Sequence, residues 1–413
     1  MTLKIVKVLV LSLMMPLFYA PDSAAEYILK KSLHVREEYN DNIFLSEKNR
    51  QEDFITTISP AFKLVYQRPL IELAFDYGLN IRLYADHADQ NDISLDRSQN
   101  GKFDSTLSLY KEIFYLKVFD EYKRVPIDQR DKIALDNVLV NMTDMNYFAF
   151  NPFVQYPLTG TLTARASYIY ENKWYRDNPE SDLFNHVLDF SMTKELSERV
   201  RSTVSYSYLF HRPNLFADRY NNQNATAGIE YQVTPKLLLA GSGGLSWFNY
   251  ESGTDSADNI WSTSARYLLT GKATISAAYS EKFNNAVLLG TFRQKKGSVM
   301  LEYSGAVPVT LTFFKNTDTY KLVDRSDDGW GAGVSSHLQL SPRLTGSLIT
   351  NYTHYRFLPQ GDEVDRVGAG LSVTYEGRVA NVSFGYTHNL TESTEPGGSF
   401  RNNIIWAQAG ATF

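Results

Sequence analysis

IELAFDYGLNIRLY, residues 71–84, alternates apolar and polar side chains over its whole length. Apolar residues take the seven odd positions from Ile71 to Leu83, and Glu72, Asp76 and Arg82 are among the residues between them. A strand turns successive side chains to opposite faces, whereas a helix with 3.6 residues per turn would scatter these apolar residues around its axis. The stretch therefore predicts a β-strand with one apolar and one polar face.

The same alternation recurs along the rest of the chain, for example at 200–210, 225–233 and 367–375. No window carries a convincing helical stripe, and the only long uninterrupted apolar run lies near the N-terminus. We therefore expect an all-β protein.

The connections between these strands alternate in length. Short segments occur at 67–69, 111–112, 158–160, 196–198, 234–236, 270–272, 295–297, 341–343 and 376–378, and most of them contain a Pro or a Gly, which set the backbone angles of tight turns. Longer polar segments lie between them, at 40–52, 86–102, 124–142, 175–184, 212–222, 250–258, 316–328, 357–364 and 389–401, with 284–285 as one short exception. This order predicts an up-and-down array of about 18–20 antiparallel strands. The count treats 298–315 as one bulged strand, and a hairpin there, or a plug near 33–38, would change it by two.

Composition narrows the class of protein. Aromatic residues make up 14% of the 413 residues and charged residues only 21%, and the mean hydropathy is −0.31. The absence of cysteine excludes disulfides and thiolate metal or redox sites. A net charge of −5 argues against a nucleic-acid partner.

The N-terminus predicts an exported protein. Lys4 and Lys7 precede the apolar run 8–20, and the small residues Ser23, Ala24 and Ala25 follow it. A basic start, an apolar stretch of this length and small residues before the cleavage point are typical of a secretory signal peptide. The run is shorter than the roughly 20 residues that a membrane-spanning helix needs. We therefore expect a signal peptide over residues 1–25 and a mature domain over 26–413.

A membrane barrel accounts for the two-faced strands better than a soluble sandwich. Tyr and Phe gather near strand ends on the apolar face, as in interfacial girdles, at Tyr156, Tyr168, Tyr170, Tyr208, Phe210, Tyr267, Tyr279 and Tyr386. In hydrocarbon every backbone group must be paired within the protein, so a β-sheet can span the membrane only as a closed barrel. We predict an all-β, single up-and-down transmembrane barrel in the outer membrane of a Gram-negative bacterium, in contact with its lipid. The alternating end, residues 405–413 with Phe413 last, resembles the signal read by the barrel-assembly machinery.

Charged residues on the polar face are predicted to line the lumen, because a Lys or Arg facing lipid near the midplane would cost about 2–4 kcal/mol. The candidates are Glu72, Asp76, Arg82, Lys117, Glu121, Arg165, Glu171, Arg201, Glu230, Arg266 and Glu302, and Asp189 shares their phase. They would set a field along a pore, or only solvate the wall and pair with one another. About twenty strands enclose too wide a space for side chains alone to fill, so a water-filled or loop-plugged channel follows.

Catalytic and metal motifs are weak. The seven histidines include no HExxH pair. Ser335 and His337 share a strand face and could form a nucleophile and base, but no acidic partner is identifiable, and both residue types are ordinary in a lumen. The segment 86–92 could donate oxygens to calcium, yet it lacks a known loop spacing and is explained equally well as a solvated loop. We predict no catalytic, cofactor or metal site.

Two short motifs near the start of the mature chain resemble a known family. Tyr39-Asn40-Asp41-Asn42-Ile43-Phe44 and Asp53-Phe54-Ile55-Thr56-Thr57-Ile58-Ser59-Pro60 are similar to the opening of outer-membrane β-barrel porins associated with exopolysaccharide-synthesis and exosortase (PEP-CTERM-type) operons. The turn Leu340-Ser341-Pro342-Arg343-Leu344 is similar too. The resemblance implies a barrel that takes part in export of a polysaccharide, with a separate periplasmic export protein as its partner. The family pattern contains no catalytic residue.

The leading prediction is thus a non-enzymatic outer-membrane channel for an exopolysaccharide. A general small-solute porin is an alternative within the same class. An outer-membrane enzyme, or a surface receptor that uses the long loops 86–102 and 124–142, is an alternative of another class. The sequence leaves open the transported molecule, the oligomeric state and whether a loop folds into the barrel.

Overall fold

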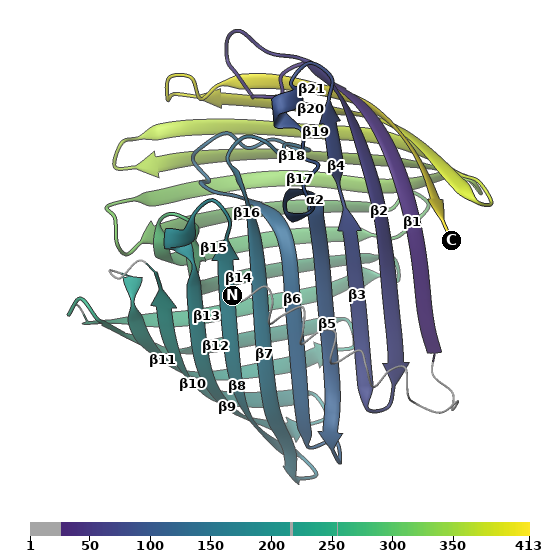
Figure 1. Ribbon diagram of the computed structural model, residues 1–413. Helices are drawn as coiled ribbons and strands as arrows, with labels where there is room; N and C mark the ends of the chain where they lie inside the picture. Colours follow the sequence, from purple (N-terminus) through teal and green to yellow (C-terminus); the bar gives the residue numbers. More distant parts are fainter. Residues whose placement is uncertain (1–25, 215–217, 254) are drawn as a thin grey trace.

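The computed structural model describes residues 26–214, 218–253 and 255–413, and in this part of the chain 21 strands form one closed antiparallel sheet (Figure 1). β3 and β4 follow one another along the same neighbour, β2, and so count as two segments of one strand of the wall. The barrel therefore has twenty strands around its wall. The predicted up-and-down barrel is confirmed. No helix among the described residues is long and apolar enough to cross a bilayer. The predicted signal peptide, residues 1–25, lies outside the described residues.

The first half of the wall consists of β1 (Glu26–Asn40), β2 (Asp53–Arg68), β3 (Ile71–Leu79), β4 (Ile81–Tyr84), β5 (Gln99–Tyr110), β6 (Phe114–Pro126), β7 (Met142–Thr159), β8 (Leu162–Tyr175), β9 (Leu183–Ser197), β10 (Val200–Pro213) and β11 (Tyr220–Thr234). The second half consists of β12 (Leu237–Tyr250), β13 (Asp255–Thr270), β14 (Ala273–Ala286), β15 (Gly290–Tyr303), β16 (Val309–Tyr320), β17 (Ser326–Ser341), β18 (Leu344–Leu358), β19 (Asp362–Glu376), β20 (Ala380–Ser393) and β21 (Phe400–Thr412). Helical turns occur only in loops, at η2 (Ala88–Gln90), α2 (Leu95–Ser98) and η3 (Pro179–Ser181) of the described residues.

The barrel closes where β1 pairs with β21, from Ser32 opposite Thr412 to Asn40 opposite Ile404. Figure 1 shows these strands, purple and yellow, side by side. Polar residues just beyond β1 reinforce the closure. Asp41 accepts hydrogen bonds from the backbone and side-chain N–H groups of Asn403, both at 2.6 Å. The Tyr39–Phe44 motif therefore joins the first strand to the last.

Several short turns share one local design. An aliphatic residue is left out of the pairing as a bulge just before the turn in six hairpins, at Leu109, Leu158, Leu196, Val233, Leu269 and Leu340. The next residue is a Ser or Thr in five of them, and its hydroxyl accepts the N–H two residues on, as in Thr234 to Lys236 (3.2 Å). The hydroxyl thus satisfies a backbone donor that the strand pairing leaves free.

The strand register assigns every strand residue to one of two faces, because paired residues point the same way. Large apolar side chains such as Val204, Leu371 and Ile405 occupy the outward face and are more than half exposed, which is the state expected of a surface that lipid covers. The predicted girdle residues, from Tyr156 to Tyr386, share this face. The opposite face is mainly polar and encloses the lumen.

One predicted turn is wrong. Lys295, Lys296 and Gly297 lie in the middle of β15, and the turn is formed by 304–308. The segment 298–315 is therefore a hairpin and not a single bulged strand, and the connection expected at 284–285 falls at 287–289. The two shifts compensate, so the number of strands stays at twenty. The strand near 33–38 belongs to the wall and is not a plug.

The wall divides at one place. β13 and β14 pair only up to Ser262 opposite Ser280, although β13 begins at Asp255 and β14 continues to Ala286. Above this point β14 stays paired with β15, up to Ala286 opposite Gly290. We call residues 281–293 the leaning hairpin, because they give up backbone pairing with β13 and contact the interior of the barrel, while Glu281 and Arg293 keep side-chain contacts with Trp261 and Asp258 of β13.

Candidate functional site

A loop folds into the mouth of the barrel and reaches the far wall. It spans residues 127–141 between β6 and β7, and we call it the inserted loop. Its base is closed by the Ile127 N–H, which donates to the Asn141 carbonyl at 3.0 Å, and by the Asn141 amide, which binds the backbone N–H and C=O of Asp128. Its other contacts lie on the loop before β17, on β19 and β20, on β1 and the loop that follows it, and on β2 and β4. β17 is nearly opposite β6, since ten strands, β7 to β16, separate them on one side.

An ion pair holds the near end of the inserted loop. Arg325 donates to both carboxylate oxygens of Asp128, at 3.1 and 3.2 Å, and to both oxygens of Asp327, at 2.7 and 2.9 Å. The Arg325 side chain is 10% exposed and that of Asp327 2%. Burial opposes ionisation of Asp128, but the hydrogen bonds from Arg325 and from the Arg130 N–H outweigh it and lower the pKa of Asp128. Burial likewise opposes the charge of Arg325, and the two carboxylates nevertheless raise its pKa.

Backbone groups of the inserted loop are bound by side chains of the opposite strands. The Arg366 guanidinium on β19 donates to the carbonyls of Gln129 and Asp131, at 2.7 and 2.9 Å. The Asn389 amide on β20 accepts from the Leu135 N–H at 2.8 Å and donates to the Leu135 carbonyl at 3.1 Å. Asn389 therefore binds the loop as a neighbouring strand would.

The far end of the inserted loop is fixed by charge and by apolar packing. Asp136 accepts from Thr387 at 3.0 Å and lies 3.5 Å from Arg36. Leu139 packs against an apolar cluster of Ile43, Ile55 and Tyr84. A further close fit occurs at Gly368 on β19, where a Cβ atom would come within 2.9 Å of the Leu135 side chain.

The leaning hairpin narrows the mouth from another side. Phe283 packs on Phe248, with ring centroids 4.4 Å apart, and Asn285 contacts His211 at 3.1 Å. Its tip meets the inserted loop, since Leu288 and Asp128 line one cavity of about 430 Å³. The two elements together narrow the long-loop half of the lumen.

The short-turn half of the lumen is wetter. Lys117 and Arg201 have side chains 45% and 53% exposed, in contrast to the nearly buried Arg325. Arg201 lies 3.7 Å from both Glu195 and Glu230, which leaves these charges weakly paired in water. Small hydroxyl side chains cover much of the wall next to Arg201 and Glu230.

The register places all eleven predicted lumen residues on the face that the inserted loop contacts, namely Glu72, Asp76, Arg82, Lys117, Glu121, Arg165, Glu171, Arg201, Glu230, Arg266 and Glu302. Most of them lie near the short turns and are not gathered into one site. Arg82 is an exception near the mouth, 3.5 Å from Asp92. Glu171 is another, bonded to Tyr147 at 2.6 Å. Their part in transport stays a prediction.

The alternative sites from the sequence find little geometric support. His337 contacts Ser347 at 2.9 Å and not Ser335. Asp92, in the segment considered for calcium, is bound to Arg82 and Arg124. No group of three or more His, Cys, Asp or Glu residues could hold a metal ion in the described part of the chain.

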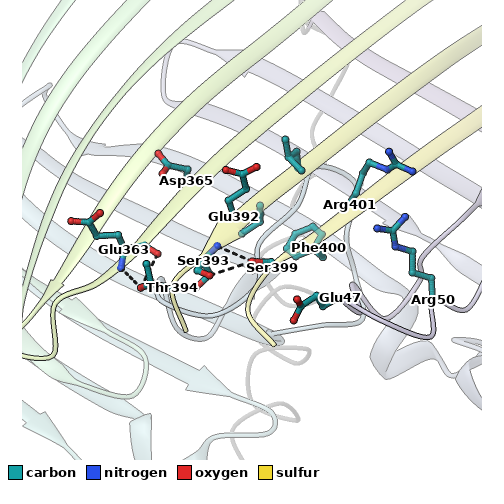
Figure 2. A pocket seen from close by; sticks show the side chains of 12 residues that line it. Glu47, Arg50, Glu363, Asp365, Glu392, Ser393, Thr394, Ser399, Phe400 and Arg401 are labelled. Carbon is teal, nitrogen blue, oxygen red and sulfur yellow. Dashed lines mark hydrogen bonds between the residues drawn. The ribbon is translucent and has the colours of Figure 1, made fainter. Parts of the chain in front are cut away.

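A cleft of about 700 Å³ lies at the outer rim, and Figure 2 shows its charged lining. Asp365, Glu392 and Arg401 enter it from the outward face of β19 to β21. Asp365 already contacts His354 at 3.0 Å. Because this cleft faces away from the lumen, the mouth with its inserted loop is the candidate functional site.

Sequence reasoning missed the residues that fix the inserted loop. Asp128, Arg325, Arg366 and Asn389 were not among the candidates, although 124–142 was noted as a long polar segment. One signal was present. The loop contains Ile127, Ile133, Leu135 and Leu139 at intervals, and a loop exposed to water has no need of so many aliphatic residues.

Comparisons with known proteins concern the fold. No family model matches the chain, and no curated protein matches it. Two mutants of the ferric enterobactin receptor PfeA from Pseudomonas aeruginosa are similar in structure, with TM-scores of 0.51 and 0.50 and identities of 11% and 10%. The matched regions cover 95% and 93% of this chain, and 81% and 80% of the PfeA chains. OccK2 (OpdF) of the same organism has a TM-score of 0.45 and 12% identity, covering 93% of this chain and 98% of its own.

The closed wall and its outward apolar face define the class, and the likeness to PfeA agrees with them in fold: the chain is a transmembrane β-barrel that resides in the outer membrane of a Gram-negative bacterium. Its short turns accordingly face the periplasm and its long loops the exterior.

Proposed function

We propose that the protein is a passive channel for hydrophilic solutes across the outer membrane, and that its solute is an exopolysaccharide. The observation that supports this most directly is the division of the lumen. A polar, water-accessible half opens to the periplasm, and a fixed inserted loop narrows the exit. A narrowed polar passage favours solutes that slide through by weak contacts and excludes wide, folded ones.

The narrowing also favours a second candidate, a general porin for small hydrophilic solutes. The resemblance of the Tyr39–Phe44 and Asp53–Pro60 motifs favours the polysaccharide, whereas the comparisons give no evidence for either solute. A non-enzymatic role remains our proposal, since His337 contacts Ser347 and not Ser335, the serine considered with it in the sequence. A receptor that uses 124–142 is less favoured, because 127–141 is directed into the lumen.

Planar-bilayer conductance tests the channel and its constriction. The purified full chain is compared with a variant in which residues 130–139 are replaced by two glycines. We expect the replacement to raise the single-channel conductance several-fold, because it removes the loop from the mouth. Replacing residues 47–50, which are exposed at the same end, is the matched control and should change little. A wild-type protein without conductance would contradict the channel.

Adding a polysaccharide then distinguishes the exopolysaccharide channel from the small-solute porin. Export predicts that a linear polysaccharide on the periplasmic side lowers the wild-type current in a concentration-dependent manner. An open current that polysaccharide does not alter would favour the small-solute porin.

A further inference from the structure

Four aromatic rings form a stripe on the lumen face of β6 and β7. Tyr115 and Phe153 stack at 4.8 Å with an interplanar angle of 11°, close to the periplasmic turn. Phe119 and Tyr147 pack at 5.6 Å, further toward the inserted loop. Tyr115 and Phe119 are four residues apart, which is about 13 Å along a strand. We call these four residues the lumen aromatic stripe, and the strand register places all of them on the inward face.

Hydrogen-bonding and charged groups border the lumen aromatic stripe. Arg165 lies over Phe153 at 4.1 Å, and Lys102 and Lys173 lie over Phe119 and Tyr147 at 5.5 and 5.7 Å. Asn151 lies between the two ring pairs, and its Oδ1 is buried without a hydrogen-bond partner. All four rings are only half-buried, so they remain accessible from the lumen.

The neighbouring lumen wall is different in kind. β9 to β13 present small hydroxyl side chains that bond to one another, as in Thr193 with Thr203 (3.2 Å) and Ser242 with Ser262 (2.8 Å). These residues line a cleft of about 540 Å³ together with glycine, alanine and the charged residues Arg201 and Glu230, and with Ile229 and Tyr279 at its edge. The lumen thus has an aromatic side, which runs from the periplasmic turn toward the mouth, and a hydroxyl side.

From this asymmetry we infer that the lumen aromatic stripe is a binding track for carbohydrate rings, an inference that rests on the proposed channel function. A sugar ring has a face of C–H groups and a rim of hydroxyls. The parts of the aromatic faces that Arg165, Lys102 and Lys173 leave open attract the C–H groups, while these cations and the nearby amides and hydroxyls bind the rim. Two ring pairs at this spacing give a linear saccharide two weak sites in succession, and weak successive sites allow movement through a channel.

Blocking of the ion current by maltohexaose, a linear glucose oligomer, tests the track in the full-length protein. Phe119→Leu and Phe153→Leu keep apolar side chains but remove the rings. We expect the doubly substituted channel to need about three- to tenfold more maltohexaose for half-maximal block. Phe314→Leu is the matched control, because Phe314 also faces the lumen beneath a lysine, Lys296 at 5.3 Å, but lies on β16. It should leave the half-blocking concentration unchanged.

Polyethylene glycol of similar size lacks sugar rings and serves as the control polymer. Its effect on the current should be the same in the wild-type and the doubly substituted channel. The inference is overturned if maltohexaose does not block the wild type, or if it blocks the wild type and the doubly substituted channel equally. In both cases an intact ion conductance would show that the proposed channel function stands. An absent conductance, in contrast, would count against the channel itself.

Discussion

At the scale of single residues, the inserted loop depends on partners that are distant in sequence. Arg366 binds carbonyl groups more than two hundred residues away, and Asn389 pairs with Leu135. Alternation along a strand gives the face on which a side chain lies, which is why the eleven candidates share the lumen face. It carries no information on which loop a lumen residue will meet, so Arg366 and Asp128 could not be chosen from the sequence. The Tyr39–Phe44 motif was noted, but its role in closing the barrel emerges only from the contacts of Asp41 with Asn403.

Titration of Asp128 should release the near end of the inserted loop in acid. Its pKa is lowered from an ordinary value of 3.8, so the stability it contributes is complete above that value and is lost as the pH falls through the folded pKa. We expect the conductance to be steady from pH 7 to about 4 and to rise below that range. Asp128→Asn should raise it already at neutral pH, by removing charge-assisted bonds worth about 1.5–3 kcal/mol. If the conductance of Asp128→Asn rises in acid as much as that of the wild type, the rise is caused by other carboxylates.

At the scale of elements, most of the wall follows from local sequence. Alternation located nearly all strands, and Pro and Gly marked most of the turns, whereas the recurring bulge with its Ser or Thr emerges only from the strand register. The turn expected at 295–297 shows the limit of this reasoning. Two lysines and a glycine are typical of a turn, but Gly297 lies within β15 opposite Tyr279, and the pairing of the whole strand outweighs the local preference for a turn. Pro308 and Gly305, in the loop that does turn, had been assigned to a bulge.

Adjacent residues on β19 test the assignment of the two faces. Leu371 points outward and Ser372 into the lumen. Leu371→Arg should destabilise the barrel by about 2–4 kcal/mol if it lies near the midplane, since the charge would face hydrocarbon. Ser372→Arg should cost little, because water reaches this half of the lumen. Urea unfolding in lipid vesicles measures both, and equal losses would mean that the faces are assigned wrongly.

At the scale of the whole molecule, the mouth is narrowed by elements from two parts of the wall. The inserted loop arises from β6 and β7 and is fixed to the far strands, whereas the leaning hairpin comes from β14 and β15. The two meet where Leu288 and Asp128 line one cavity. The leaning hairpin reaches that position because β14 gives up its pairing with β13 above Ser280. The divided wall and the narrowed mouth are thus one structural feature.

Paired cysteines can locate this division, because the natural chain contains no cysteine to compete. Ala265 and Ala277 are direct partners on β13 and β14, so Ala265→Cys with Ala277→Cys should form a disulfide readily upon oxidation. If the same register continued upward, Ala257 would lie opposite Asn285, yet the side chain of Asn285 contacts His211 instead. Ala257→Cys with Asn285→Cys should therefore remain unlinked under the same conditions, as judged by mass spectrometry of the oxidised protein in lipid. Equal cross-linking of both pairs would mean that β13 and β14 are joined along their whole length and that the leaning hairpin does not enter the mouth.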